Sequence, residues 1–368
     1  MELTADHLAA ELINLGRSVG LDAVGMADAR PFPEVRAELE RRRATGLSGG
    51  MQFTYRNPER STDPGRILDG ARSLVVAARR TPAPRLADVG AGRMRIAAYA
   101  RHDHYADLRR GLSRLAGHLQ AGGWATRVVA DDNALVDRAA AVRAGIGWWG
   151  RNANVLLPGR GSWFVLGAVV TNAPLPVSEP IDDGCGTCRR CLDGCPTGAI
   201  VEPGVVDARR CLAWLVQAPG SIPREFRAAL GGRLYGCDDC QEVCPVGRPD
   251  RMADGTDDPA ADVEAVWVLR AKDDDLMDRF GQWYIADRDP TYLRRNALVA
   301  LGNTAAGDDP AVAGLLEVYL ASDNSILRSH AVWAADRLGR LDLLDGLEAG
   351  RDLLVAEELA AVRDRVGA

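Results

Sequence analysis

The chain has 368 residues, a formal net charge of −6 and a hydrophobic content of 47%. This length allows two or three domains, and the apolar content excludes a disordered chain. The longest apolar stretch, residues 163–170, is too short to span a bilayer, and the N-terminus lacks the basic start and apolar run of a secretion signal. We therefore expect a cytoplasmic protein with no membrane partner. In that compartment, clustered cysteines bind metal more often than they form disulfides.

Charge is distributed unevenly along the chain. Residues 36–114 hold 17 arginines against 8 acidic residues, whereas residues 251–289 hold 11 acidic residues against 5 basic ones. Such segregation would suit one basic face that binds a polyanion. Alternatively, the arginines simply solvate the surface of a chain that uses arginine in place of lysine. Composition alone leaves both interpretations open.

The first 177 residues are predicted to form a sheet covered by helices. Amphipathic spacing predicts helices at 4–18 and 105–120, and residues 137–144 also have a helical pattern. Runs rich in valine and aromatic residues predict strands at 73–78, 95–100, 126–130 and 163–171. The alternation of strands with helices is typical of an α/β domain. A proline-rich linker, residues 172–180, ends this domain.

All eight cysteines lie within residues 178–250. The first four have the spacing Cys185-x2-Cys188-x2-Cys191-x3-Cys195 followed by proline, as in bacterial ferredoxins, where the fourth cysteine ligates the other of two [4Fe–4S] clusters. A second group, Cys237-x2-Cys240-x3-Cys244 followed by proline, is one cysteine short, and Cys211 completes it. Crossed ligation predicts Cys185, Cys188, Cys191 and Cys244 for cluster 1, and Cys195, Cys211, Cys237 and Cys240 for cluster 2. Two structural zinc sites with four cysteines each are the alternative, although zinc does not require a run of four that ends in Cys-Pro.

Residues 251–368 begin with the acidic stretch and then become helical. They contain a weak internal repeat, because Arg294-Arg-Asn-Ala-Leu-Val-Ala-Leu-Gly302 resembles Arg328-Ser-His-Ala-Val-Trp-Ala-Ala335 at an offset of 34 residues. That period is typical of paired-helix repeats. Two copies predict a small helical cap rather than a long solenoid.

Two motifs in the first domain bear on chemistry. Gly145-Ile-Gly147-Trp-Trp-Gly150 has the letters of a dinucleotide-binding motif, but it follows a predicted helix rather than a strand. We therefore expect its glycines to permit close packing or backbone approach to a flat cofactor. Asp131-Asp132 follows the strand predicted at 126–130, and sites commonly form at the carboxyl ends of strands. A carboxyl group there could act as a general acid, and a helix N-cap is the alternative.

Several motifs spread over nearly the whole chain resemble the epoxyqueuosine reductase family. They are Cys-Gly-Thr-Cys-Arg-Arg-Cys-Leu-Asp-Gly-Cys-Pro-Thr-Gly-Ala-Ile at 185–200, Tyr-Gly-Cys-Asp-Asp-Cys-Gln-Glu-Val-Cys-Pro at 235–245, Ala-Gly-Ile-Gly-Trp-Trp-Gly-Arg-Asn at 144–152, Gly-Ser-Trp-Phe at 161–164, and Arg-Asn-Ala-Leu-Val-Ala-Leu-Gly-Asn at 295–303. The resemblance implies reduction of epoxyqueuosine to queuosine at the wobble position of tRNA, with cobalamin bound base-off and reduced through two [4Fe–4S] clusters. It also implies a cobalamin-binding α/β domain at 1–177, a ferredoxin-like two-cluster domain at 178–250, and an acidic linker with a HEAT-like, tRNA-binding helical cap at 251–368. A low-potential electron donor of the flavodoxin or ferredoxin type is expected, and so is a monomer.

The same resemblance implies roles for single residues. The family's proton donor falls on Asp131, with Asp132 as the fallback. The residues expected to contact cobalamin are Arg60, Arg138, Gly150, Arg151, Asn152 and Ser162. The residues expected to bind tRNA, together with part of the basic stretch 36–114, are Arg294, Arg295 and Arg328. Pairing of these arginines with acids such as Asp308, Asp309 and Asp336 is the alternative.

The chain departs from the family pattern around the presumed pocket. Asp103-His104-Tyr105 stands where the family has Asp-Tyr-His, Ala134 replaces a proline, and Trp214-Leu-Val-Gln-Ala218 and Val246-Gly247 also differ. These differences keep open the same machinery acting on another epoxide or an organohalide. A cofactor-free iron–sulfur electron carrier is a third possibility, but such a carrier needs neither the long N-terminal domain nor a helical cap.

Overall fold

The computed structural model describes residues 4–82, 90–247 and 258–367. By packing, these residues form two compact units. The N-terminal unit comprises the described residues of 4–82, 102–211 and 238–247, and the C-terminal unit comprises 90–101, 212–237 and 258–367. Among the described residues, no helix is long and apolar enough to span a membrane.

A four-stranded antiparallel sheet forms the centre of the N-terminal unit. Its strands, in spatial order, are β1 (Ala23–Asp28), β2 (Ser73–Arg80), β7 (Phe164–Thr171) and β4 (Thr126–Ala130). The two central strands are almost wholly buried, which explains why they are continuous apolar runs. The strands predicted at 73–78, 126–130 and 163–171 are confirmed.

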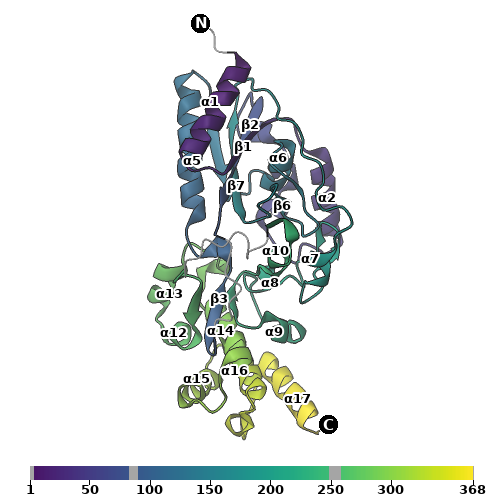
Figure 1. The fold of residues 1–368 in the computed structure, drawn as a ribbon. Helices are drawn as coiled ribbons and strands as arrows, with labels where there is room; N and C mark the ends of the chain where they lie inside the picture. The colour runs from purple at the N-terminus through teal and green to yellow at the C-terminus, as the bar shows by residue number, and fades with distance from the viewer. Residues whose placement is uncertain (1–3, 83–89, 248–257, 368) are drawn as a thin grey trace. The chain divides into compact units, whose positions relative to one another are not determined.

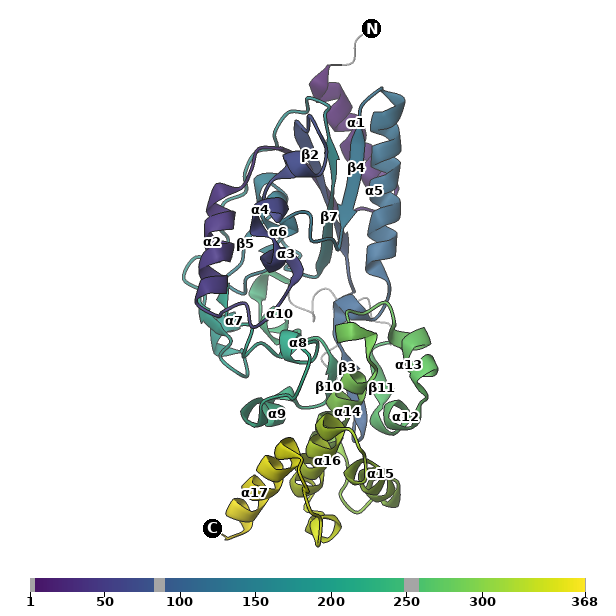
Figure 2. The same cartoon turned by 180° about the vertical axis from the view of Figure 1, so that it is seen from behind.

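Helices cover both faces of this sheet, as Figures 1 and 2 show. On one face lie α1 (Ala5–Ser18) and α5 (His104–Ala121), whose leucines pack against Val75 and Val169. On the other lie α2 (Pro33–Ala44) and α6 (Asp137–Arg143), which share a core with Val76. Because successive strand residues point to opposite faces, Val75 and Val76 serve different cores. The α/β architecture expected for this region is therefore present.

Short elements complete the N-terminal unit. Those before the cysteine segment are α3 (Phe53–Arg56), α4 (Pro58–Ser61), η1 (Pro64–Arg66), β5 (Trp148–Trp149) and β6 (Val155–Leu156). Those within it are α7 (Arg190–Asp193), β8 (Ile200–Glu202), β9 (Val205–Val206), α10 (Asp239–Glu242) and η3 (Pro245–Gly247). The ends of α7 and α10 lie close together, since a Cβ on Gly194 would stand 3.1 Å from the side chain of Val243.

A small sheet opens the C-terminal unit. Its order is β10 (Arg233–Tyr235), β3 (Arg93–Ile96) and β11 (Asp262–Glu264), with β3 parallel to β10 and antiparallel to β11. The strand predicted at 95–100 is therefore partly wrong. It ends at Ile96, continues as the 3-10 turn η2 (Ala98–Ala100), and belongs to this sheet because its partners are β10 and β11.

The rest of the C-terminal unit is helical, as expected for residues 290–368. Its elements are α8 (Leu212–Leu215), α9 (Arg224–Leu230), α12 (Ala265–Arg270), α13 (Asp273–Phe280), η4 (Ala286–Arg288), α14 (Thr291–Thr304), α15 (Pro310–Leu320), α16 (Ser325–Arg337), η5 (Leu341–Leu344) and α17 (Leu353–Gly367). The two repeat helices, α14 and α16, pack closely, because a Cβ on Gly302 would stand 2.9 Å from the ring of Trp333. That these helices form a HEAT-like repeat stays a prediction.

Packing groups the residues differently from three consecutive domains. Residues 90–101 and 212–237 join the C-terminal unit, because β3 and β10 pair and because Met94 and Leu234 share a core with α14. The cysteine segment is thus divided by packing rather than standing alone. Of the boundaries expected at 177/178 and 250/251, the second lies outside the described residues.

Candidate functional site

Asp131 lies directly after β4, and its backbone is in the left-handed region with φ of 55°. The side chain is about half exposed, and its Oδ2 lies 3.9 Å from Nη2 of Arg109, which also donates to the carbonyl of Ala130 at 3.4 Å. Partial burial raises the pKa of the Asp131 carboxyl; Arg109 lowers it, and Asp137, Asp103 and Asp132 raise it again. The carboxyl group therefore keeps its proton to a higher pH than an ordinary aspartate, as a general acid requires.

Asp132 is used differently from its neighbour. Its Oδ1 accepts the backbone N–H of Ala134 at 2.9 Å and so closes a local turn. The next helix, α6, begins after Val136 and has no side-chain cap. The N-cap alternative for this aspartate pair is therefore wrong, and the carboxyl group that is not used in a turn is that of Asp131.

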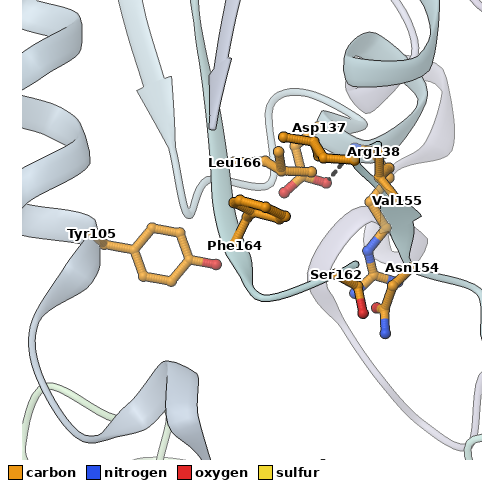
Figure 3. A pocket seen from close by; sticks show the side chains of 9 residues that line it. Tyr105, Asp137, Arg138, Asn154, Val155, Ser162, Phe164 and Leu166 are labelled. Atoms are coloured by element: carbon orange, nitrogen blue, oxygen red, sulfur yellow. Dashed lines mark hydrogen bonds between the residues drawn. The ribbon is translucent and has the colours of Figure 1, made fainter. Parts of the chain in front are cut away.

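A cavity of about 80 Å³ lies beside β7, the neighbour of β4 in the sheet (Figure 3). Its lining is Tyr105, Asp137, Arg138, Asn154, Val155, Leu157, Ser162, Phe164 and Leu166. Burial, followed by the negative charges of Asp137 and Asp131, raises the pKa of Tyr105, and burial raises that of Asp137. Arg138 spans the lining, and its Nη1 donates to the carbonyl of Ala153 at 3.1 Å. The lining thus offers the guanidinium of Arg138, the amide of Asn154 and the hydroxyl of Ser162. It also holds Tyr105 and Asp137, both with raised pKa values.

A chain of hydrogen bonds leads from this cavity to the cysteine motifs. Asn152 Nδ2 donates to Ser162 Oγ at 3.5 Å, and Ser162 Oγ donates to Gln241 Oε1 at 2.9 Å. Gln241 Nε2 in turn donates to Asp238 Oδ1 at 3.1 Å. Because Gln241 directly follows Cys240, these bonds join the rim of the cavity to the segment that carries the second cysteine group.

A second cavity, of about 30 Å³, brings together Cys185, Cys188, Cys191 and Cys244. These are the four cysteines predicted for cluster 1. Burial raises the pKa of Cys191 to about 11, with further contributions from Cys244 and Cys185, so a bound metal would be needed to keep this thiol deprotonated. Within the described part of the chain, no three His, Cys, Asp or Glu side chains are placed to hold a single metal ion. Sulfurs around a shared cavity are the arrangement that a multi-iron cluster requires.

One cysteine predicted for each cluster accepts a hydrogen bond at sulfur. Trp148 donates its indole N–H to Cys185 Sγ at 3.4 Å, and the backbone N–H of Ala199 donates to Cys195 Sγ at 3.2 Å. Such bonds tune the reduction potential of an iron–sulfur cluster. Joint ligation of cluster 2 by Cys195, Cys211, Cys237 and Cys240 stays a prediction.

The six residues expected near cobalamin are distributed over the two cavities and the surface. Arg138 and Ser162 line the first cavity, and Arg151 and Asn152 line the second. A Cβ on Gly150 would stand 2.6 Å from Asn152 Oδ1, so only glycine fits that turn. Arg60 is exposed on α4 and lines neither cavity.

The glycine motif does not form a dinucleotide site. It follows α6, which ends at Arg143, and it contains β5, so a helix precedes a strand, the reverse of the strand–helix order that a dinucleotide motif needs. A Cβ on Gly145 or Gly147 would meet backbone carbonyls at 2.1 Å or 2.4 Å. Close packing, one of the two explanations that the sequence offered, therefore accounts for Gly145 and Gly147.

Sequence reasoning missed three residues of the site. Tyr105 and Asp137 line the first cavity, and Gln241 links it to the cysteines. The available signals were the position of Tyr105 in the first turn of a predicted helix and that of Gln241 inside a cysteine motif. Neither signal predicts a direction for the side chain.

The arginines expected to bind tRNA make internal contacts. Arg295 is fully buried, and the prediction that it binds phosphate is wrong: its guanidinium donates to the carbonyls of Leu215 and Ala218. Arg294 pairs with Asp273 at 2.6 Å, and Arg328 donates to the carbonyls of Leu320 and Glu348. None of these contacts is with the acids proposed as alternative partners. One of those acids, Asp336, pairs instead with Arg224 at 3.3 Å. Contact of the partly exposed Arg294 and Arg328 with tRNA stays a prediction.

Comparisons with known proteins cover nearly the whole chain. Residues 184–247 match the model of the 4Fe-4S double cluster binding domain. An epoxyqueuosine reductase of Bacillus anthracis is 31% identical over 348 residues, which covers 91% of this chain and 90% of the relative. The structure of epoxyqueuosine reductase from Streptococcus thermophilus matches with a TM-score of 0.87 at 29% identity, over 98% of this chain and 99% of that one. A crystal structure of epoxyqueuosine reductase with a tRNA-Tyr epoxyqueuosine-modified stem loop matches with a TM-score of 0.85 at 29% identity, over 97% and 99%. With this identity along nearly its whole length, the chain belongs to the epoxyqueuosine reductase family.

Proposed function

We propose that this enzyme reduces epoxyqueuosine to queuosine at the wobble position of tRNA. The observation that carries the proposal is the continuity of the site: an acid with a raised pKa, a polar cavity, and a hydrogen-bonded chain that ends in the cysteine motifs. The family to which the chain belongs supplies the substrate. The protein is expected to act as a cytoplasmic monomer.

Cobalamin is the cofactor that the first cavity would serve. Its lining offers the guanidinium of Arg138, the amide of Asn154 and the hydroxyl of Ser162, which suit the amide groups at the edge of a corrin. The cavity is small, and it would take in such polar groups rather than the ring. When bound, cobalamin supplies low-valent cobalt to attack or reduce the epoxide carbon.

The cysteines would carry electrons to this site. Cys185, Cys188, Cys191 and Cys244 would hold the cluster within the second cavity, and the remaining four cysteines would hold its neighbour. An electron donor of the flavodoxin or ferredoxin type would reduce the pair. Asn152 lines the second cavity and bonds to Ser162 of the first, so the two sites share a wall.

Asp131 would protonate the oxygen as the epoxide opens. Breaking the C–O bond produces an alkoxide, and a neutral carboxyl group nearby removes that charge in the transition state. Arg109 would hold the carboxyl group in place without fully ionising it, because desolvation outweighs its effect on the pKa of Asp131. Positioned proton transfer is worth about 10²–10⁴-fold in rate.

The test is turnover of epoxyqueuosine-containing tRNA by anaerobically purified protein with its clusters and cobalamin in place. Asp131→Asn is expected to bind both cofactors and to lose about 10²-fold or more in turnover. Asp132→Asn is the matched control, and it should lose little. Normal turnover by Asp131→Asn together with inactive Asp132→Asn would make Asp132 the general acid. Normal turnover by both variants would show that neither aspartate is the general acid.

A second candidate is reduction of another epoxide or an organohalide. It is favoured by the altered Val246, which lines the second cavity, and by the burial of Arg295, which removes one expected tRNA contact. The two functions differ in salt dependence. Phosphate contacts release counterions, so tRNA affinity should fall steeply with salt, and Arg294→Ala with Arg328→Ala should make that slope shallower. Failure of the intact enzyme to bind tRNA at low salt would favour the second candidate.

A further inference from the structure

Tyr284 is an aromatic side chain at the surface of the C-terminal unit. It lies in the segment between α13 and η4, and it is 40% exposed, whereas its neighbours Trp283 and Ile285 are buried. Alternation of inward and outward side chains explains this, since Trp283 and Ile285 both join the hydrophobic core. The segment therefore presents one ring outward from a firmly packed base.

The ring of Tyr284 is supported from below by a second ring. Trp214 of α8 is almost completely buried, and it stacks with Tyr284 at 6.4 Å between centroids and 27° between planes. Stacking on a buried indole restricts the tyrosine to one orientation. Tyr284 is thus an ordered platform rather than a freely rotating surface side chain.

The backbone under the platform is fixed as well. Tyr235 donates its hydroxyl to the carbonyl of Tyr284 at 3.0 Å. Trp283 is stacked between Tyr235 and Phe280, each at 4.3 Å, and its indole N–H donates to the carbonyl of Ala100 at 2.7 Å. Because the side chain is already ordered, a ligand that binds to Tyr284 would lose little free energy in restricting its conformation.

The surroundings of the ring are polar and carry mixed charge. Gln282 is exposed in the same segment, Asp287 and Arg288 are exposed in the adjoining η4, and Arg288 donates to the carbonyl of Gly281 at 2.9 Å. A membrane or an apolar helix would need a wider hydrophobic patch than one ring. A flat ring with polar edges fits better, because it can stack on Tyr284 while its edges face polar side chains.

We propose that Tyr284, stacked on Trp214, is a binding platform for an unpaired nucleobase of the RNA substrate. This inference rests on the proposed function, in which the substrate is a tRNA loop. Aromatic side chains bind splayed bases of single-stranded RNA by stacking, and such stacking tolerates any base. Because the site carries mixed charge, its contribution should come from the ring and not from phosphate contacts.

The experiment measures the affinity of the anticodon stem–loop for the full-length enzyme with clusters and cobalamin bound. Tyr284→Ala should weaken binding about tenfold, while Tyr284→Phe, which keeps the ring, should bind as the parent does. Val318→Ala is the matched control, since Val318 is 65% exposed on α15 of the same unit. The slope of affinity against salt should be the same for Tyr284→Ala and the parent, because no phosphate contact is lost.

The outcomes separate the platform from the proposed function. If the parent binds the stem–loop and Tyr284→Ala binds equally well, the platform does not exist. A weaker Tyr284→Ala with a shallower salt slope, or a Tyr284→Phe that is as weak as Tyr284→Ala, would also overturn stacking as the cause. If the parent itself does not bind the stem–loop, the proposed function fails, whatever Tyr284 does.

Discussion

Replacing Arg295 with methionine should destabilise the C-terminal unit without touching an RNA-binding surface. The buried guanidinium donates to the carbonyls of Leu215, Ala218 and Gly220, and to Asn296 Oδ1. Burial lowers the pKa of Arg295 to about 9, so keeping a positive charge on this buried side chain costs free energy. Methionine would remove that cost but leave the acceptors without their donor.

The size of the loss follows from those acceptors. Each buried acceptor left unpaired costs about 1–3 kcal/mol, and relief of the buried charge offsets part of the sum. We expect a net loss of about 3 kcal/mol in the free energy of unfolding. For a unit of this size, that lowers the melting temperature by about 6–12 °C. The free energy of unfolding of Arg295→Lys should lie between those of the parent and of Arg295→Met. One ammonium group cannot donate to all the carbonyls that the planar guanidinium reaches.

Differential scanning calorimetry of the full chain measures this loss, and tRNA affinity is measured well below the transition. Arg288→Met is the control, because Arg288 is exposed and its removal should change stability by about 0.5 kcal/mol or less. Arg295→Met should keep the tRNA affinity of the parent. Unchanged melting together with lost tRNA affinity would refute the structural role and restore Arg295 as a phosphate ligand.

Three other changes test the site and the core. Arg109→Gln removes the charge that lowers the pKa of Asp131, so the loss of turnover that accompanies deprotonation of Asp131 should move to higher pH; an unshifted pH profile would remove Arg109 from this role. Cys211→Ala should leave about half of the roughly eight irons expected for two clusters, whereas stoichiometric zinc without sulfide in the parent would contradict the clusters altogether. His330 accepts the backbone N–H of Ile222 at 3.2 Å and must be neutral to do so, and burial lowers its pKa well below 6.5. As the pH falls, the unfolded chain therefore binds a proton at His330 before the folded chain does. The free energy of unfolding should fall by up to about 1.4 kcal/mol per pH unit below pH 6.5. His330→Gln should make this pH dependence weaker in unfolding curves measured from pH 7 to 5.5.

The central sheet could be predicted because burial shapes its sequence. β2 and β7 are covered on both faces, so they are continuous apolar runs. β1 was missed because Ala23–Asp28 contains two alanines and a glycine, with Gly25 placed where a Cβ would stand 2.1 Å from the carbonyl of Ala144. The sheet to which β3 belongs depends on partners more than 130 residues away, which no local pattern contains.

The candidate site was predictable where spacing dictates ligation. The crossing of the two cysteine motifs predicted the four cysteines that surround the second cavity. Arg295 shows the limit of such reasoning. An arginine at the start of each repeat helix suggests a charged face, but its burial depends on carbonyls of residues 215–220, which approach only when the chain folds. The residue type alone therefore does not tell whether an arginine is buried or exposed.

The left-handed backbone at Asp131 limits which acid can stand there. Among residues with side chains, aspartate and asparagine enter this region most readily, because their short polar groups bond locally, whereas longer side chains pay a steric cost. Glutamate would supply the same carboxyl group but would strain the corner after β4 and extend it by one methylene. Asparagine, by contrast, keeps the backbone conformation and replaces the acidic group by a neutral amide of nearly the same size. The geometry of the turn therefore favours aspartate at this position independently of the proton transfer proposed for it.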